Sequence, residues 1–153
     1  MAEPLVRRLR VAAVVLGAVT VGIHLLHTSY GGAVLPVYLL AGRLADPRPL
    51  AFLLGAFAIV FCGMLAYVDL ARGPAYLATA AVACTFVVGF GVWHTVLDHG
   101  AFWPHLSSRG HDTRGPLLVV LDHLLADRLA LVSKVAEVGL AVVSMALYRM
   151  DGE

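Results

Sequence analysis

The sequence predicts an all-α integral membrane protein, a bundle of four transmembrane helices. Hydrophobic residues make up 60% of its 153 residues and charged residues only 14%, and the mean hydropathy is +0.86. Soluble domains are about half apolar and about a quarter charged, so this composition is typical of a protein embedded in lipid. The length fits one membrane domain over residues 1–153. The net charge of +1 gives no basic surface for nucleic acid.

Long uncharged runs predict where the chain crosses the membrane. A helix of about 20 apolar residues spans the hydrocarbon core. Three runs of at least 20 residues carry no formal charge, and a fourth run of that length carries only Lys134 and Glu137. Because the apolar residues are continuous rather than alternating, helices are favoured over barrel strands. The predicted spans are residues 9–28, 50–69, 75–98 and 128–149.

The connections and the flanking charges predict a topology. Residues 33–42 form a short interfacial segment, either a helix or a re-entrant turn, and residues 99–127 form a long polar loop. Three arginines before the first span favour a cytoplasmic N-terminus, although arginines on the opposite side nearly balance them. A cleaved signal peptide over residues 1–28 is the competing interpretation. It is less favoured because the run lacks a small-x-small cleavage site.

Two related segments indicate a duplicated two-helix hairpin. VGIHLLHT at 21–28 resembles VGFGVWHT at 88–95, and each is followed by an LAD-R element before the next span. Chance similarity is the alternative, since Val, Gly, Leu and Ala are common in this chain. In a duplication, His27 and His94 would lie at the same depth, related by a pseudo-two-fold axis along the membrane normal.

All histidines fall at one end of the predicted bundle, opposite the N-terminus. A carboxylate one helical turn from a histidine can fix its tautomer, so we expect Asp98 to support His94 and Asp127 to support His123. His105 and His111, in the polar loop, are expected to be solvated. The seven histidines are His24, His27, His94, His99, His105, His111 and His123.

Glu137 lies too deep in its predicted span to reach water, and a charge there is costly. We therefore expect it to pair with Lys134, three residues earlier, or with a group in the bundle interior. Cys62 and Cys84 lie within uncharged runs without CxxC spacing, so both are predicted to be buried free thiols.

The first functional hypothesis is a small b-type cytochrome in electron transfer or quinone redox. Haem b needs two axial ligands on opposite sides of its plane, and imidazoles from facing helices can supply them. His27 and His94 are the preferred pair, with His24 and His123 as substitutes, and Glu137 and Lys134 would handle protons for a quinone. The expected partners are the lipid bilayer, a redox protein and a second copy of the chain.

The second hypothesis is a metal-dependent membrane enzyme that acts on lipid. Imidazole and carboxylate ligands suit iron or zinc, although the HxxxH and HxxHH spacings of histidine-box enzymes are absent. A proton-coupled transporter module and an accessory protein without chemistry are further alternatives, so the sequence leaves open whether the chain is an enzyme. The candidate ligands for iron or zinc are His24, His27, His94, Asp98, His99 and His123.

Overall fold

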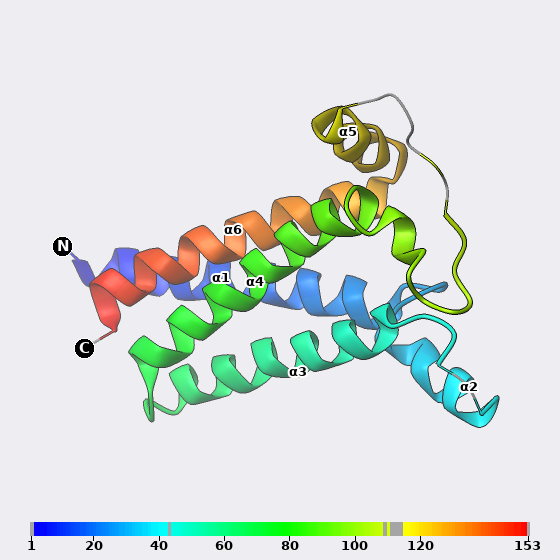
Figure 1. The fold of residues 1–153 in the computed structure, drawn as a ribbon. Helices are drawn as coiled ribbons and strands as arrows, with labels where there is room; N and C mark the ends of the chain where they lie inside the picture. Colours follow the sequence, from blue (N-terminus) through cyan, green and yellow to red (C-terminus); the bar gives the residue numbers. More distant parts are fainter. Residues whose placement is uncertain (1, 43, 109, 111–114, 153) are drawn as a thin grey trace.

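The computed structural model describes residues 2–42, 44–108, 110 and 115–152, which are helical with no strand among them. Four helices are long and apolar enough to cross a membrane, and they run side by side in alternating directions (Figure 1). This confirms the all-helical class and the four helices of spanning length. Their bounds are Ala2–Leu26 for α1, Arg48–Tyr67 for α3, Arg72–His94 for α4 and Arg128–Asp151 for α6.

The helices extend beyond the predicted spans where charged residues continue them. Helix α1 begins at Ala2 rather than at residue 9, because the arginines before the apolar run are themselves good helix formers. Helix α4 begins at Arg72, two residues before Pro74. Apolar run length therefore locates the lipid-compatible part of each helix but not its ends.

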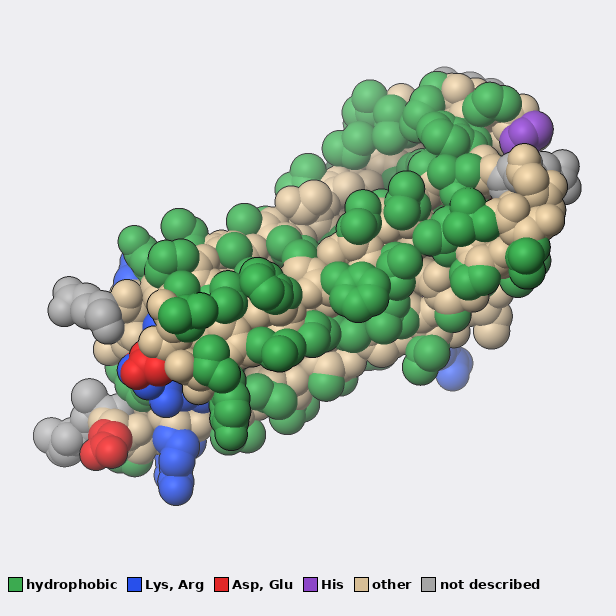
Figure 2. Space-filling view, turned by 90° about the horizontal axis from the view of Figure 1, so that it is seen from below, with side chains coloured by type: hydrophobic (Ala, Val, Ile, Leu, Met, Phe, Trp, Pro, Cys, Tyr) green, Lys and Arg blue, Asp and Glu red, His purple; other side chains and the backbone are tan. Residues whose placement is uncertain are grey.

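Small side chains hold the bundle together. Helix α1 packs on α3 and α6, and α4 packs on the same two helices. Ala83 and Leu140 are 0% and 1% exposed at the centre of the core, and alanines of this kind let helices approach closely without a hydrophobic driving force from water. Figure 2 shows an apolar middle on one face of the bundle, with most of its charged side chains at the end where the termini lie.

The terminal end of the bundle is closed by an ion pair between its first and last helices. The Arg10 guanidinium donates to the Asp151 carboxylate over 2.9 and 2.7 Å. The Tyr76 hydroxyl donates to the same carboxylate over 2.8 Å. These contacts join α1, α4 and α6 at the end opposite the histidines (Figure 1).

The connections at the histidine end contain more helix than the sequence predicts. The first holds a 3-10 turn and the short helix α2, Leu35–Leu40, in the predicted interfacial segment. The second holds the turn Asp98–Gly100 and helix α5, Pro116–Ala126, within the predicted polar loop. This helix is apolar apart from Asp122 and His123, but its 11 residues are too few to cross a membrane, so run length alone missed it.

The order of the helices agrees with a duplicated hairpin but does not establish one. A long helix, a 3-10 turn, a short helix and a second long helix follow one another twice along the chain. Asp46 and Asp127 of the two LAD-R elements also act alike, because each accepts the backbone N–H two residues later, over 2.8 and 2.9 Å. Asp127 is the N-cap of α6, whereas Asp46 lies one residue before Pro47, the N-cap of α3.

One prediction about the cysteines is wrong. Cys62 is buried as expected, but Cys84 is exposed. The buried side of α4 runs through Thr79, Ala80 and Ala83, and Cys84 falls outside that stripe.

Candidate metal centre and cavity

A cavity of about 1130 Å³ lies at the end of the bundle opposite the termini. Helices α1, α3, α4, α5 and α6 all contribute to its walls, so it is built by the whole bundle rather than by one hairpin. The histidines thus gather at one end, as the sequence predicts. His111 lies outside the described residues. The histidines that line the cavity are His24, His27, His94, His99, His105 and His123.

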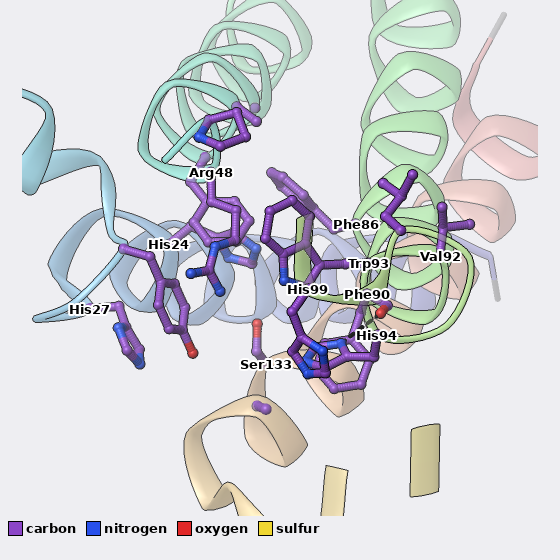
Figure 3. A pocket seen from close by; sticks show the side chains of 18 of the residues that line it. His24, His27, Arg48, Phe86, Phe90, Val92, Trp93, His94, His99 and Ser133 are labelled. Carbon is purple, nitrogen blue, oxygen red and sulfur yellow. Dashed lines mark hydrogen bonds between the residues drawn. The ribbon is translucent and has the colours of Figure 1, made fainter. Parts of the chain in front are cut away.

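Three of these histidines converge on one point. One ring nitrogen from each of His94, His99 and His123 lies within 4.8 Å of the other two. The Nε2 atoms of His99 and His123 are 3.1 Å apart, and the ring centroids of His94 lie 5.0 and 4.6 Å from those of His99 and His123. Figure 3 shows the His94 and His99 rings meeting beside the cavity. We refer to these three residues as the histidine triad.

Two of the triad rings are each oriented by the backbone of their own helix. His94 is the last residue of α4, and its Nδ1–H donates to the Phe90 carbonyl over 2.8 Å. His123 repeats this geometry on α5, where its Nδ1–H donates to the Val119 carbonyl over 2.8 Å. A carbonyl can only accept, so Nδ1 carries the proton and Nε2 carries the lone pair that a metal requires.

A left-handed turn places the third ring. Asp98, His99 and Gly100, which follow the end of α4 at His94 after three intervening residues, have φ angles of 41°, 60° and 83°. Such angles cost about 1–3 kcal/mol at each non-glycine residue, although Asp and His tolerate them better than most residues. A Cβ at Gly100 would clash with the Trp93 indole. The turn therefore needs its glycine, and it folds His99 back toward His94.

The predicted partner of His94 lies beside His99 instead. Asp98 Oδ1 is 3.6 Å from His99 Nδ1, and the other carboxylate oxygen accepts from the Ser108 hydroxyl. The pairing with His94 is not formed because α4 ends at His94, so the chain has already left the helix at Asp98. The Asp98 carboxylate nevertheless lies beside the imidazole of a triad residue, His99.

The predicted pairing of His123 with Asp127 is also not formed. Asp127 has extended backbone between α5 and α6, with φ −115° and ψ 105°, which breaks the one-turn spacing. Its carboxylate accepts the backbone N–H groups of Leu129 and Ala130 over 2.9 and 3.1 Å. Asp127 is therefore the N-cap of α6.

His24 belongs to a separate polar group deeper in the bundle. Its Nδ1–H donates to the Thr20 carbonyl over 2.9 Å, and its Nε2 faces Glu137 Oε1 at 3.5 Å. Glu137 is 0% exposed and accepts from Ser133 and Lys134 over 2.6 and 2.5 Å. The predicted pairing of Glu137 with Lys134 is confirmed. Glu137 does not line the cavity, whereas His24, Ser133 and Lys134 do.

His27 lies across the cavity from the triad, at the opposite side of the view in Figure 3. Its ring stacks on Tyr30 with centroids 3.6 Å apart, and its Nδ1 accepts from the Ser29 N–H over 3.2 Å. Burial lowers the pKa of His27, and the nearby carboxylate of Asp127 only partly opposes that effect. Burial likewise raises the pKa of the Tyr30 hydroxyl.

Arg48 is a cavity residue that sequence reasoning missed. Its guanidinium lies 4.2 Å from the Tyr30 ring centroid and 4.8 Å from that of Trp93, and it pairs with Asp46 over 2.5 Å. Cation–π contacts of this kind join residues far apart in the chain, so spacing gives no signal for them. Arg48 also belongs to the first LAD-R element, but the repeat alone predicts no contact with Asp46.

The comparisons with known proteins add no assignment to this geometry. No protein-family model, no curated protein and no solved structure matches the chain.

Proposed function

We propose that the histidine triad holds one divalent transition-metal ion, and that the chain is a metal-dependent membrane enzyme whose reaction takes place in the cavity. The convergence of three imidazole nitrogens from three separate segments carries this proposal. In a tetrahedral zinc site with Zn–N bonds of 2.0–2.1 Å, two ligand nitrogens are about 3.3 Å apart. The 3.1 Å between His99 Nε2 and His123 Nε2 is close to that spacing.

The donor set favours zinc. Three imidazoles with a fourth position left open is an arrangement of catalytic zinc, whereas the common non-haem iron site uses two histidines and a carboxylate. The triad borders the cavity, so the fourth position would face it. An ion held there would polarise a bound oxygen atom as a Lewis acid.

The same geometry is less suited to haem b. Axial imidazoles need a flat macrocycle between them, and a third imidazole within 4.8 Å of both nitrogens would occupy its plane. His27, the preferred axial partner of His94 in the sequence analysis, is engaged with Tyr30 and Ser29 on the other side of the cavity. Both ring nitrogens of His24 face other partners, Thr20 and Glu137.

The interior supports an enzyme more than a transport pathway. Between Glu137 and the Asp151 ion pair, the buried side of α6 carries Leu140 and Leu147, which are 1% and 0% exposed. Leu140 packs there with Ile59 and Ala83 in the core. The described residues thus pack closely between the cavity and the end of the bundle where the termini lie.

Metal analysis combined with an absorption spectrum tests the proposal. Purified protein equilibrated with zinc in detergent should retain about one ion per chain, and His94→Ala, His99→Ala and His123→Ala should each lose it. His27→Ala is the matched control, because His27 lines the same cavity outside the triad, and it should retain the ion. A Soret band in protein as isolated, or zinc retention in all four variants, would overturn the proposal.

A further inference from the structure

The cavity extends from the triad into the level of the hydrocarbon core. On α3 it is lined from Arg48 to Ala58, and on α4 from His94 back to Val82. At a rise of 1.5 Å per residue these stretches are about 15 and 18 Å long. The hydrocarbon core is about 30 Å thick, so the cavity reaches roughly its middle.

One wall of the cavity is open toward the side of the bundle. Helices α3 and α4 are joined by a short turn and diverge toward the histidine end (Figure 1). The cavity is lined there by Ala51 and Leu54 of α3 and by Thr85 and Gly89 of α4, and all four residues are exposed. A shallow groove on α4 shares Thr85 and Gly89 and continues the opening onto the outer surface.

The wall formed by α3 and α4 changes from polar to apolar along this length. The triad and Arg48 lie at the end of the bundle, and Leu54, Ala58 and Val82 line the deeper part of that wall. The polar side chains His24, Ser133 and Lys134 line the opposite wall, on α1 and α6. Phe86 packs against Gly55, with its ring so close that a Cβ there would overlap it, whereas the neighbouring Leu54 and Thr85 are exposed and leave the outer side of this wall open. A ligand that lies along the α3–α4 wall must therefore be polar at the triad end and aliphatic along the rest.

We propose that the cavity binds a single-chain carboxylic acid that enters sideways from the bilayer between α3 and α4. Its aliphatic chain lies along Leu54, Thr85 and Gly89, and its carboxylate reaches the fourth position of the metal ion. The position of the aliphatic chain is inferred from the cavity alone, and the position of the carboxylate rests on the metal centre proposed above.

The charges around the cavity favour a ligand with a carboxylate over one with a neutral head group. The three imidazoles are neutral ligands, so among the described residues only the Asp98 carboxylate beside His99 offsets part of the charge of a divalent ion. The other charges that face the cavity are paired or engaged within the protein: Arg48 with Asp46, Lys134 with Glu137, and Asp127 with the N-terminus of α6. The metal ion is therefore the centre that an anionic oxygen would neutralise.

Quenching of Trp93 fluorescence by a bromine-substituted stearic acid tests the inference, because Trp93 lines the cavity. The acid should quench zinc-loaded protein in detergent, and Trp93→Phe should remove most of that quenching. Gly89→Leu should weaken binding about tenfold or more, since a leucine there fills space equivalent to several methylenes of chain. A Cβ at Gly89 meets nothing within 4 Å, so the variant should fold.

Gly63→Leu is the matched control. Gly63 is also an exposed helical glycine whose Cβ would meet nothing within 4 Å, but it lies on α3 outside the cavity. Its affinity for the acid should equal that of the wild type. Equal binding by Gly89→Leu and Gly63→Leu, or the absence of quenching, would overturn the inference even if zinc binds to the triad.

The methyl ester of the same acid separates the chain from the head. Removing zinc with a chelator should weaken binding of the acid about tenfold or more and leave the ester unchanged, because only the acid supplies an anionic ligand. If zinc binds and the acid and ester show equal affinities, the carboxylate assignment is overturned. If the acid binds in a Gly89-dependent way but zinc does not bind, the proposed metal function is wrong, and the binding site for the aliphatic chain between α3 and α4 is supported.

Discussion

The Nε2 atoms of His99 and His123 lie 3.1 Å apart, although 24 residues separate them in the chain. His99 is placed by a left-handed turn after α4, and His123 is brought over the end of the bundle by α5. With His94 at the end of α4, three backbone segments deliver one imidazole each to a single point. The distance between His99 and His123 also fits a hydrogen bond between the two rings, so our interpretation of the triad as a metal centre depends on the third imidazole, His94, which converges on the same point.

Changing Asp98 to asparagine should weaken zinc binding without preventing it. The carboxylate lies 3.6 Å from His99 Nδ1 and stands behind a ligand, and loss of such outer partners typically costs about 10–100-fold in metal affinity. Asparagine tolerates the left-handed backbone at this position as aspartate does. Competition with a chromophoric chelator measures the affinity.

Asp69→Asn is the control for this change. Asp69 also has a positive φ of 59°, but it lies in the turn between α3 and α4, at the end of the bundle away from the histidines. Its zinc affinity should match that of the wild type. An Asp98→Asn affinity equal to that of Asp69→Asn would show that Asp98 does not support the centre.

Replacing Gly100 with alanine should damage both stability and metal binding. An L-residue at a φ of 83° is strained by about 1–2 kcal/mol, and the added Cβ would also clash with Trp93. Relief of that clash must move the turn that carries His99. Thermal unfolding and zinc titration should therefore change together.

Gly110→Ala separates the backbone strain of a positive φ from the clash with Trp93. Gly110 also has a positive φ, 59°, but a Cβ there meets nothing within 4 Å. It should lose some stability and keep full zinc affinity. A Gly100→Ala variant with unchanged zinc affinity would contradict the role of this turn in placing His99.

The Lys134–Glu137 pair should behave as a buried ion pair. Removing one partner from such a pair typically costs about 3–5 kcal/mol, because the other charge is left alone, whereas replacing both by apolar residues is often neutral. Lys134→Met should therefore lower the melting temperature in detergent, and Lys134→Met combined with Glu137→Leu should recover part of the loss, because Ser133 and His24 then lose Glu137 as their partner. Additive losses in the double variant would indicate that each residue stabilises the bundle separately.

His27 should make the fold more stable at neutral than at acidic pH. Burial lowers its pKa below the ordinary value of 6.5, so the unfolded chain takes up a proton more readily than the folded chain. The contribution is complete above pH 6.5 and is lost as the pH falls through the folded pKa. His27→Gln should flatten this part of the stability profile, and an unchanged slope would contradict the assignment.

Run length was enough to predict the four long helices, and helical direction was enough to place the histidines at one end. Run length could not predict α5, because that helix has only 11 residues, too few for a span, and it follows a polar stretch. The Lys134–Glu137 pair was predictable because both residues lie on one uninterrupted helix, where spacing determines proximity.

The composition of the triad was not predictable, because it depends on where helices stop. His94–Asp98 and His123–Asp127 have the spacing of one helical turn, but α4 ends at His94 and Asp127 is extended. His99 contributes through a left-handed turn that no periodicity reveals. The sequence therefore identified the candidate ligands without distinguishing the three that converge.

X-ray absorption spectroscopy of the zinc-loaded protein tests the metal centre most directly. We predict three imidazole nitrogens at about 2.0–2.1 Å and one further light ligand, and we expect this first shell to be absent in His123→Ala, which should not retain the ion. A first shell with fewer than two imidazoles, or a spectrum that does not change in His123→Ala, would contradict this prediction.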